Sequence, residues 1–244
     1  MAIMQKSTNP VFSSIERSQT YASAETASYQ GITLKTASLI LLAILSGFFT
    51  VYYLPVESWM SLLIPALIVA MIAVFVSAFV PRLAMPFGIV YALAEGVVLG
   101  VLTVVVNIFV PGAGYTAAIG TATIFVVMLF LYTSRTIRVT SRFRTIMLGI
   151  LISLLFFFIV FGILGLTTQL FAGANYGILI GVSLFLIIFG ALMLALDFDR
   201  AETIVTSGAD KRYEWVVAIG LMVTIVWIYI EILRLLLILA ARRD

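Results

Sequence analysis

The sequence contains no cysteine and no histidine, and few of its residues carry a charge. Without cysteine the chain forms no disulfide and offers no thiolate to a metal ion. Without histidine it has no imidazole ligand, no histidine general base and no histidine pH switch, so proton sensing falls to carboxyl groups. Lysine, arginine, aspartate and glutamate make up 10% of the chain, against roughly 25% in soluble domains. Such a chain cannot cover itself with a polar surface.

What the sequence does contain is long apolar runs. Hydrophobic residues make up 63% of the chain, and the mean hydropathy is +1.22. Runs of about 20 residues match the length at which a helix crosses the hydrocarbon core of a bilayer. The short alternating segments of a membrane barrel are absent from the sequence. We therefore predict an all-α integral membrane protein with seven transmembrane helices, at about 32–53, 59–80, 85–110, 115–133, 146–166, 176–196 and 215–239.

Residues 1–30 are polar and rich in serine, threonine and glutamine. No apolar segment typical of a cleavable signal peptide follows Met1, so we expect a disordered cytoplasmic tail before a membrane domain over residues 31–244. Lys35, near the start of the first run, is expected to extend to the lipid headgroups.

The basic residues are distributed unevenly over the predicted loops. With seven spans, 11 of the 14 lysines and arginines fall on the side of the N-terminus, and the other side holds only Arg242 and Arg243. The positive-inside rule then predicts a multi-pass protein of the cell membrane, with the N-terminus in the cytoplasm and the C-terminus outside. A net charge of +3 spread over loops does not indicate a nucleic-acid partner.

Two acidic residues lie deep in apolar runs, where an ionisable group is costly and is usually functional. Glu95 is near the middle of the third run, where it either hydrogen-bonds a neighbouring helix or lines a polar cavity. Glu231 is in the last run, three residues before Arg234 and on the same helix face, so the two could form an ion pair within one helix. Arg234 could instead extend toward the outer surface.

Asp197 and Asp199 close the sixth run and face different directions on a helix. We expect Asp199 to be solvated or paired with Arg200. Asp197 would lie below the true helix end if the helix continues past residue 200. The glycine pairs Gly96/Gly100 and Gly177/Gly181 are expected to allow close packing of helices.

The sequence has no HExxH, GxSxG, Walker or Rossmann motif, and an intramembrane aspartyl protease would need two matched aspartates. We therefore expect a protein that is not an enzyme and has no resident cofactor.

Three segments resemble those of a known family. ALMLALDFDRAE followed by WIYIEILRLLLILA, together with FGIVYALAEGVVLG in the third run, is similar to the Bax inhibitor-1/YccA-like (TMBIM) membrane proteins. The resemblance extends in outline over about residues 30–240. It implies seven helices with the last one central, and a pH-sensitive calcium leak in which two carboxylates share a proton and gate a pore.

By matching motifs, the resemblance implies that Asp197 and Glu231 are the gating and proton-sensing pair, with Arg82 as a basic partner. Glu95 and Arg234 are candidates for support of the pore. The chain departs from the family pattern at Glu231, where aspartate is usual. Two or three carboxylates cannot supply the six to eight oxygens of a tight calcium site, so Asp197 and Glu231 would bind calcium weakly and in transit.

The leading hypothesis from the sequence is a pH-modulated calcium leak channel of the cytoplasmic membrane. One alternative is a YccA-like modulator that engages a membrane protease through the N-terminal tail. A second is a stress-protective membrane protein that transports nothing and whose carboxylates only pack. Deletion of residues 1–30 would separate the first two hypotheses, because only protease modulation should suffer.

Overall fold

The computed structural model describes residues 26–167 and 176–242, and the predicted disordered tail therefore lies almost wholly outside the described residues. Seven α-helices and one short 3-10 helix make up this part of the chain. They are α2 (Tyr29–Tyr53), α3 (Val56–Phe79), η2 (Pro81–Leu83), α4 (Ala84–Phe109), α5 (Ala113–Thr133), α6 (Ser141–Thr167), α7 (Tyr176–Thr206) and α8 (Tyr213–Ala241). Each α-helix overlaps one predicted span. Among the described residues, α2, α3, α4, α5, α7 and α8 are each long and apolar enough to cross a membrane.

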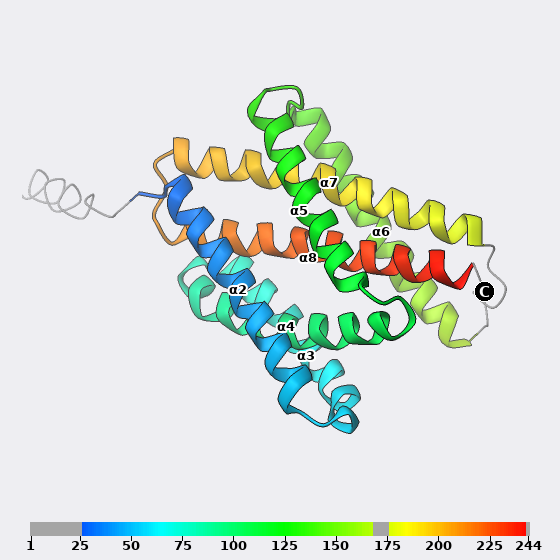
Figure 1. The fold of residues 1–244 in the computed structure, drawn as a ribbon. Helices are drawn as coiled ribbons and strands as arrows, with labels where there is room; N and C mark the ends of the chain where they lie inside the picture. Colours follow the sequence, from blue (N-terminus) through cyan, green and yellow to red (C-terminus); the bar gives the residue numbers. More distant parts are fainter. Residues whose placement is uncertain (1–25, 168–175, 243–244) are drawn as a thin grey trace, which may run out of the picture.

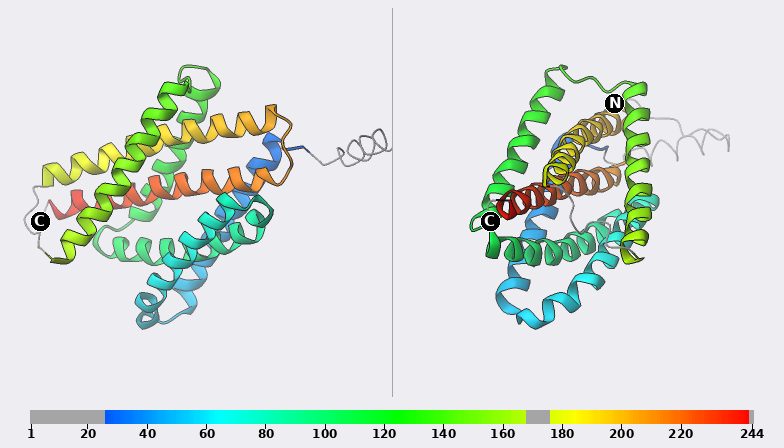
Figure 2. Two further views of the ribbon diagram at one scale, coloured as in Figure 1. Left: turned by 180° about the vertical axis from the view of Figure 1, so that it is seen from behind. Right: turned by 90° about the vertical axis from the view of Figure 1, so that its right-hand side faces the viewer.

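Helix α8 lies at the centre of the bundle, as predicted. It runs through the middle of the molecule beside α7, and the other helices surround it (Figure 1; Figure 2, right). It packs against α2, α4, α5 and α7, with a smaller contact to α3. Of the six candidate spans it is the one with the largest buried share, 56% of its most apolar window. Every ionisable group on α8 is therefore placed by contacts with several other helices.

Glycines bring α2 and α4 into backbone contact. A Cβ built on Gly100 would lie 2.7 Å from the Cα of Gly47, and one built on Gly96 would strike the carbonyl oxygen of Ala43. The predicted packing role of Gly96 and Gly100 is thus confirmed, because only glycine fits there. The second predicted pair behaves differently: a Cβ on Gly181 would meet no described atom within 4 Å.

The start of α2 is fastened to the start of α8. Ser28 caps α2 by accepting a 3.0 Å hydrogen bond from the amide of Gly31, and its own amide donates to Oε1 of Glu214 at 2.7 Å. Glu214 is fully buried and forms an ion pair with Lys35, whose ammonium also lies 5.4 Å from the ring centre of Trp215. Lys35 therefore holds two helices together and does not simply extend to the headgroups as expected.

Helix α7 continues ten residues beyond its predicted end at Leu196. The additional turns are polar, but they carry Phe198 and Ala201, which are buried beside Tyr132 of α5 in one apolar cluster. Continued packing on this face favours the helix even after the apolar run has ended. Asp197 consequently lies about 14 Å before the end of α7 by helical rise, inside the bundle and away from a loop.

Candidate functional site

Asp197 is held against the central helix. Its Oδ2 atom accepts a 2.6 Å hydrogen bond from the hydroxyl of Thr224 on α8. A Cβ built on Gly220, one turn earlier on α8, would lie 3.9 Å from Oδ1 of Asp197. Gly220 and Thr224 therefore define the stripe of α8 that faces the carboxyl group of Asp197. We call the contact between α7 and α8 along this stripe the α7–α8 seam.

Glu231 lies farther along the same stripe of α8. It follows Thr224 by seven residues, which on an α-helix is about two turns and about 10 Å, with a rotation of only about 20°. Glu231 is 7% exposed. Its Oε1 atom is 3.6 Å from a guanidinium nitrogen of Arg234, while its Oε2 atom is buried without a hydrogen-bond partner among the described residues. One oxygen of this carboxyl group is thus left unsatisfied inside the protein.

The two carboxyl groups share the seam but are not bonded to each other. Asp197 bonds Thr224, and Glu231 pairs with Arg234 on its own helix. Ile228, which is fully buried, lies between the two levels of α8. It packs on Gly190 of α7, where an added Cβ would lie 2.9 Å from Cγ1 of Ile228. An apolar layer therefore separates the two acidic positions.

A further unsatisfied polar group lies on α7. Ser183 is fully buried, and its hydroxyl has no hydrogen-bond partner within the described part of the chain. It precedes Gly190 by seven residues and so shares the face that packs on α8. Gly190 contacts Ile228, so Ser183 lies beyond the apolar layer, toward the end of the seam that holds Glu231.

The remaining candidates are dispersed. Arg82 is in η2, exposed, and forms no ion pair with another described residue. Arg234 contacts Glu231 while 39% of its side chain stays exposed. Asp199 pairs with Arg144 on α6 at 2.6 Å and not with Arg200, so that part of the prediction was wrong. Asp199 and Asp197 point to different neighbours, as their spacing predicted.

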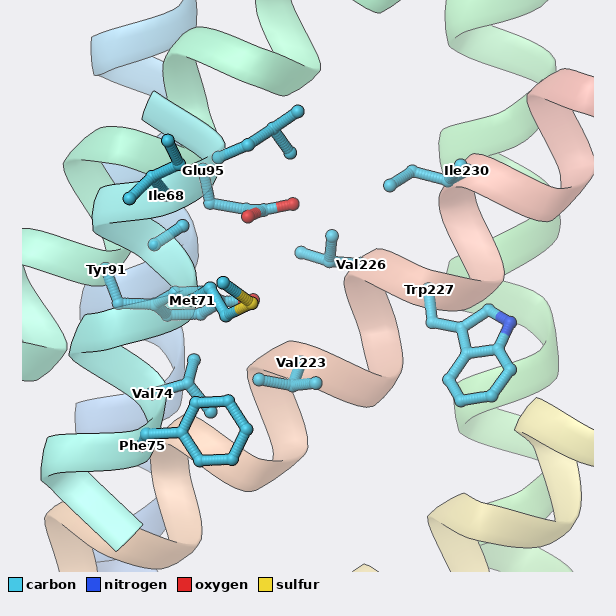
Figure 3. Close-up of a pocket in the computed structure, with 12 residues that line it drawn as sticks. Ile68, Met71, Val74, Phe75, Tyr91, Glu95, Val223, Val226, Trp227 and Ile230 are labelled. Atoms are coloured by element: carbon cyan, nitrogen blue, oxygen red, sulfur yellow. The ribbon is translucent and has the colours of Figure 1, made fainter. Parts of the chain in front are cut away.

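Glu95 projects into a separate space (Figure 3). It is 8% exposed and lines a cavity of about 500 Å³ between α3, α4 and α8. Glu95 forms no hydrogen bond or ion pair with any other residue that the structure describes. The structure thus gives Glu95 no hydrogen bond to a described residue of a neighbouring helix. It does place Glu95 at a cavity, but that cavity is apolar where a polar one was expected. The other side chains of this cavity are nearly all apolar.

A polar cluster ties the α5–α6 connection to the end of α7. Glu202 accepts hydrogen bonds from the hydroxyl of Tyr132 and, at 2.7 Å, from the guanidinium of Arg135. The pKa of Arg135 is raised, chiefly because its guanidinium donates this hydrogen bond to Glu202. Arg135 adopts a positive φ of 58°, which an L-residue rarely does. Its contacts with Glu202 hold it in this conformation.

Several residues of the site could not be recognised from the sequence. Thr224 and Ser183 are isolated small hydroxyl residues in apolar runs, and such residues usually bond the backbone of their own helix. The pairing of Lys35 with Glu214 joins residues 179 positions apart. Glu214 at the start of an apolar run was the only local signal, and it is equally typical of a helix N-terminus.

The fold and the seam define a multi-pass helical membrane protein built around a central, acid-bearing last helix. The sequence model of the family described as Bax inhibitor 1 like matches residues 9–241, so the chain belongs to this family. No curated protein matches the chain, and no solved structure does. The resemblance drawn from the sequence motifs is thereby confirmed.

Proposed function

We propose that this protein is a pH-modulated leak channel for calcium or a similar cation, with its path along the α7–α8 seam. Asp197 and Glu231 are the two acidic positions on the path, and Ile228 is the apolar barrier between them. The channel is not an enzyme and carries no cofactor, and calcium is bound only in transit. The observation that carries the proposal is the unpartnered, buried Oε2 atom of Glu231 on the stripe that also contacts Asp197.

The energetic cost of this arrangement supports a role for Glu231 in transport. A buried polar atom without a partner destabilises a protein by about 1–3 kcal/mol, and by more when it belongs to a charged group. An apolar residue, as at most other positions of α8, would avoid that cost. A carboxyl group that meets a passing cation or water recovers the missing interaction only while the path is occupied.

The separation of Asp197 and Glu231 changes the gating scheme that the family resemblance implies. A shared proton needs two carboxyl groups in hydrogen-bond contact, whereas these lie about two helical turns apart. Because the two groups are not in contact, Asp197 and Glu231 would each gain or lose a proton separately. Two ionised groups would attract a divalent cation more strongly than two neutral ones, so flux should rise with pH.

Weak binding agrees with a leak. Among the described residues no three acidic side chains come together in a way that could hold a metal ion. Calcium sites of high affinity use six to eight oxygen ligands. A path with one carboxyl group at Asp197 and one at Glu231 would hold a cation only weakly. The cation could then both enter and leave, as conduction requires.

We further propose that the N-terminus is in the cytoplasm, the C-terminus outside, and the protein in the cell membrane. Two contacts support the loop grouping behind this orientation. Ala27 donates a 2.8 Å hydrogen bond to the carbonyl of Ala209, and Arg135 pairs with Glu202. The start of α2, the α5–α6 connection and the α7–α8 connection therefore gather at one end of the bundle. The two connections carry Arg135, Arg138, Lys211 and Arg212.

The full chain, purified and reconstituted into liposomes with an internal calcium dye, tests the proposal directly. We expect protein-dependent calcium entry that is faster at about pH 8 than at about pH 6. Entry no faster than in empty liposomes at both pH values would refute a leak. A chain lacking residues 1–25 should keep its flux; loss of flux on this deletion would favour a role for the tail. The deletion must stop at residue 25, because Ser28 holds Glu214.

A further inference from the structure

The cavity at Glu95 is distinct from the α7–α8 seam. Its walls come from α3, α4 and α8, and α7 contributes no lining residue (Figure 3). On α8 the cavity is lined by Val223, Val226, Trp227 and Ile230, whereas the seam uses Gly220, Thr224 and Ile228. Trp227 also packs against Phe189 of α7, with ring centres 5.7 Å apart. What occupies this cavity is therefore a separate question from how a cation crosses the seam.

The chemistry of the walls is nearly uniform. Ten of the twelve lining residues are apolar, and the two polar ones are Glu95 and Tyr91, one turn apart on α4. Figure 3 shows the carboxyl group of Glu95 directed into the space between α4 and α8. Its burial exceeds nine-tenths, and no described residue bonds it. The cavity thus presents one acidic group at the end of an apolar chamber.

The cavity is accessible from the lipid. The α3 residues along its edge, Leu67, Ile68, Met71 and Phe75, are each about half exposed, at 48–57%. On a membrane-spanning helix such exposed apolar side chains face acyl chains. Its volume of about 500 Å³ lies within the roughly 300–1,000 Å³ of small-molecule sites. A membrane-dissolved molecule can therefore reach Glu95 without crossing water.

The single carboxyl group determines which class of molecule the cavity can bind. A metal cation would find one acidic ligand and apolar walls, and calcium needs many more oxygens. An anion would be repelled by the carboxylate. An amine with an apolar body satisfies both parts of the site, because its nitrogen forms a charge-assisted hydrogen bond with Glu95 while its hydrocarbon fills the chamber. It can enter as the neutral amine and pair with the carboxyl group as ammonium and carboxylate, with one proton shared between them.

We propose that the cavity between α3, α4 and α8 is a binding site for lipophilic amines that enter from the bilayer, with Glu95 as the ligand of the amine nitrogen. The site is distinct from the proposed cation path, because Thr224, Ile228 and Glu231 do not line it. Trp227, which lines the cavity, supplies a built-in reporter.

The test uses the full chain in an uncharged detergent, with Trp59 and Trp215 replaced by phenylalanine so that Trp227 is the remaining tryptophan. Bromoundecylamine and bromoundecanol are compared as quenchers of its fluorescence, because they differ only in the polar group. We expect the amine to reach half-maximal quenching at a concentration at least about tenfold below that of the alcohol. Equal potency of the two would overturn the proposal and indicate an acyl-chain groove without selectivity.

Variants assign the selectivity to the site. Glu95→Gln should bring amine and alcohol to equal potency, and Asp199→Asn, which removes a carboxyl group elsewhere, should leave the difference intact. Val223→Phe fills the chamber while keeping Glu95, and should weaken quenching by both compounds. The site is also refuted if the preference for the amine survives Glu95→Gln, or if Val223→Phe, in protein with an unchanged helical spectrum, leaves amine quenching unaltered.

Discussion

Oδ2 of Asp197 accepts a 2.6 Å hydrogen bond from the hydroxyl of Thr224, and this contact joins α7 to the central helix. Thr224→Val keeps the shape of the side chain and leaves the carboxyl oxygen without its donor. We expect the free energy of unfolding to fall by about 1–3 kcal/mol, measured from unfolding midpoints in detergent. The matched control is Thr121→Val, since the hydroxyl of Thr121 bonds only Ala117 of its own helix. Equal loss in both variants would mean that the Asp197 contact contributes nothing specific.

The barrier formed by Ile228 is predicted to limit flux. Ile228→Ala removes most of the side chain that fills the seam opposite Gly190. Lowering a barrier by about 1.4 kcal/mol speeds passage about tenfold, so we expect calcium entry into liposomes to rise by about that factor. Ile219→Ala is a suitable control, because Ile219 is also buried on α8 but packs toward α2 and α4. If Ile219→Ala raises flux as much as Ile228→Ala does, the barrier is not in the seam.

The glycine contact between α2 and α4 predicts a strong steric effect. Gly100→Ala places a Cβ 2.7 Å from the Cα of Gly47, where backbone cannot move aside as a flexible side chain does. We expect a loss of about 1–3 kcal/mol in stability, typical of overpacking. Gly149→Ala on α6 meets nothing within 4 Å and should be neutral or slightly stabilising. The comparison needs only thermal unfolding of the two variants, and a neutral Gly100→Ala would contradict the close approach.

The buried ion pair between Lys35 and Glu214 is predicted to matter far more than an exposed pair. Lys35→Met leaves the carboxylate of Glu214 buried with only Ser28 as a donor, and breaking such a pair typically costs about 3–5 kcal/mol. Arg212→Gln removes the 3.7 Å contact with Asp210 at the surface, which should cost at most about 1 kcal/mol. Circular dichroism melts compare the two, and similar shifts would show that Glu214 is hydrated in place.

Much of the fold follows from hydropathy, and little of the site does. All seven helices fall on apolar runs of spanning length because every backbone group in lipid must bond within its own segment. The end of α7 was predicted ten residues too early because six of its last ten residues are polar. Asp199 and Glu202 nevertheless pair with Arg144 and Arg135, and the helix continues.

Knowing where the helices lie in the sequence does not determine which side chains meet between helices. The motif predicted contact between Asp197 and Glu231, but contact depends on how far α7 slides along α8. The close approach of Gly190 to Ile228 fits a register in which Asp197 faces Thr224 and Glu231 lies about two turns beyond. Such a register is set by packing of small and large side chains and cannot be read from residue spacing alone.

The most direct test of the central claim is calcium flux through Glu231→Gln in liposomes, at about pH 6 and about pH 8, beside the wild type, Asp197→Asn and Asp199→Asn. The account predicts that Glu231→Gln and Asp197→Asn lose most of the pH dependence, because each removes a titrating group from the seam, while Asp199→Asn keeps it. Unchanged pH-dependent flux in Glu231→Gln would contradict the account.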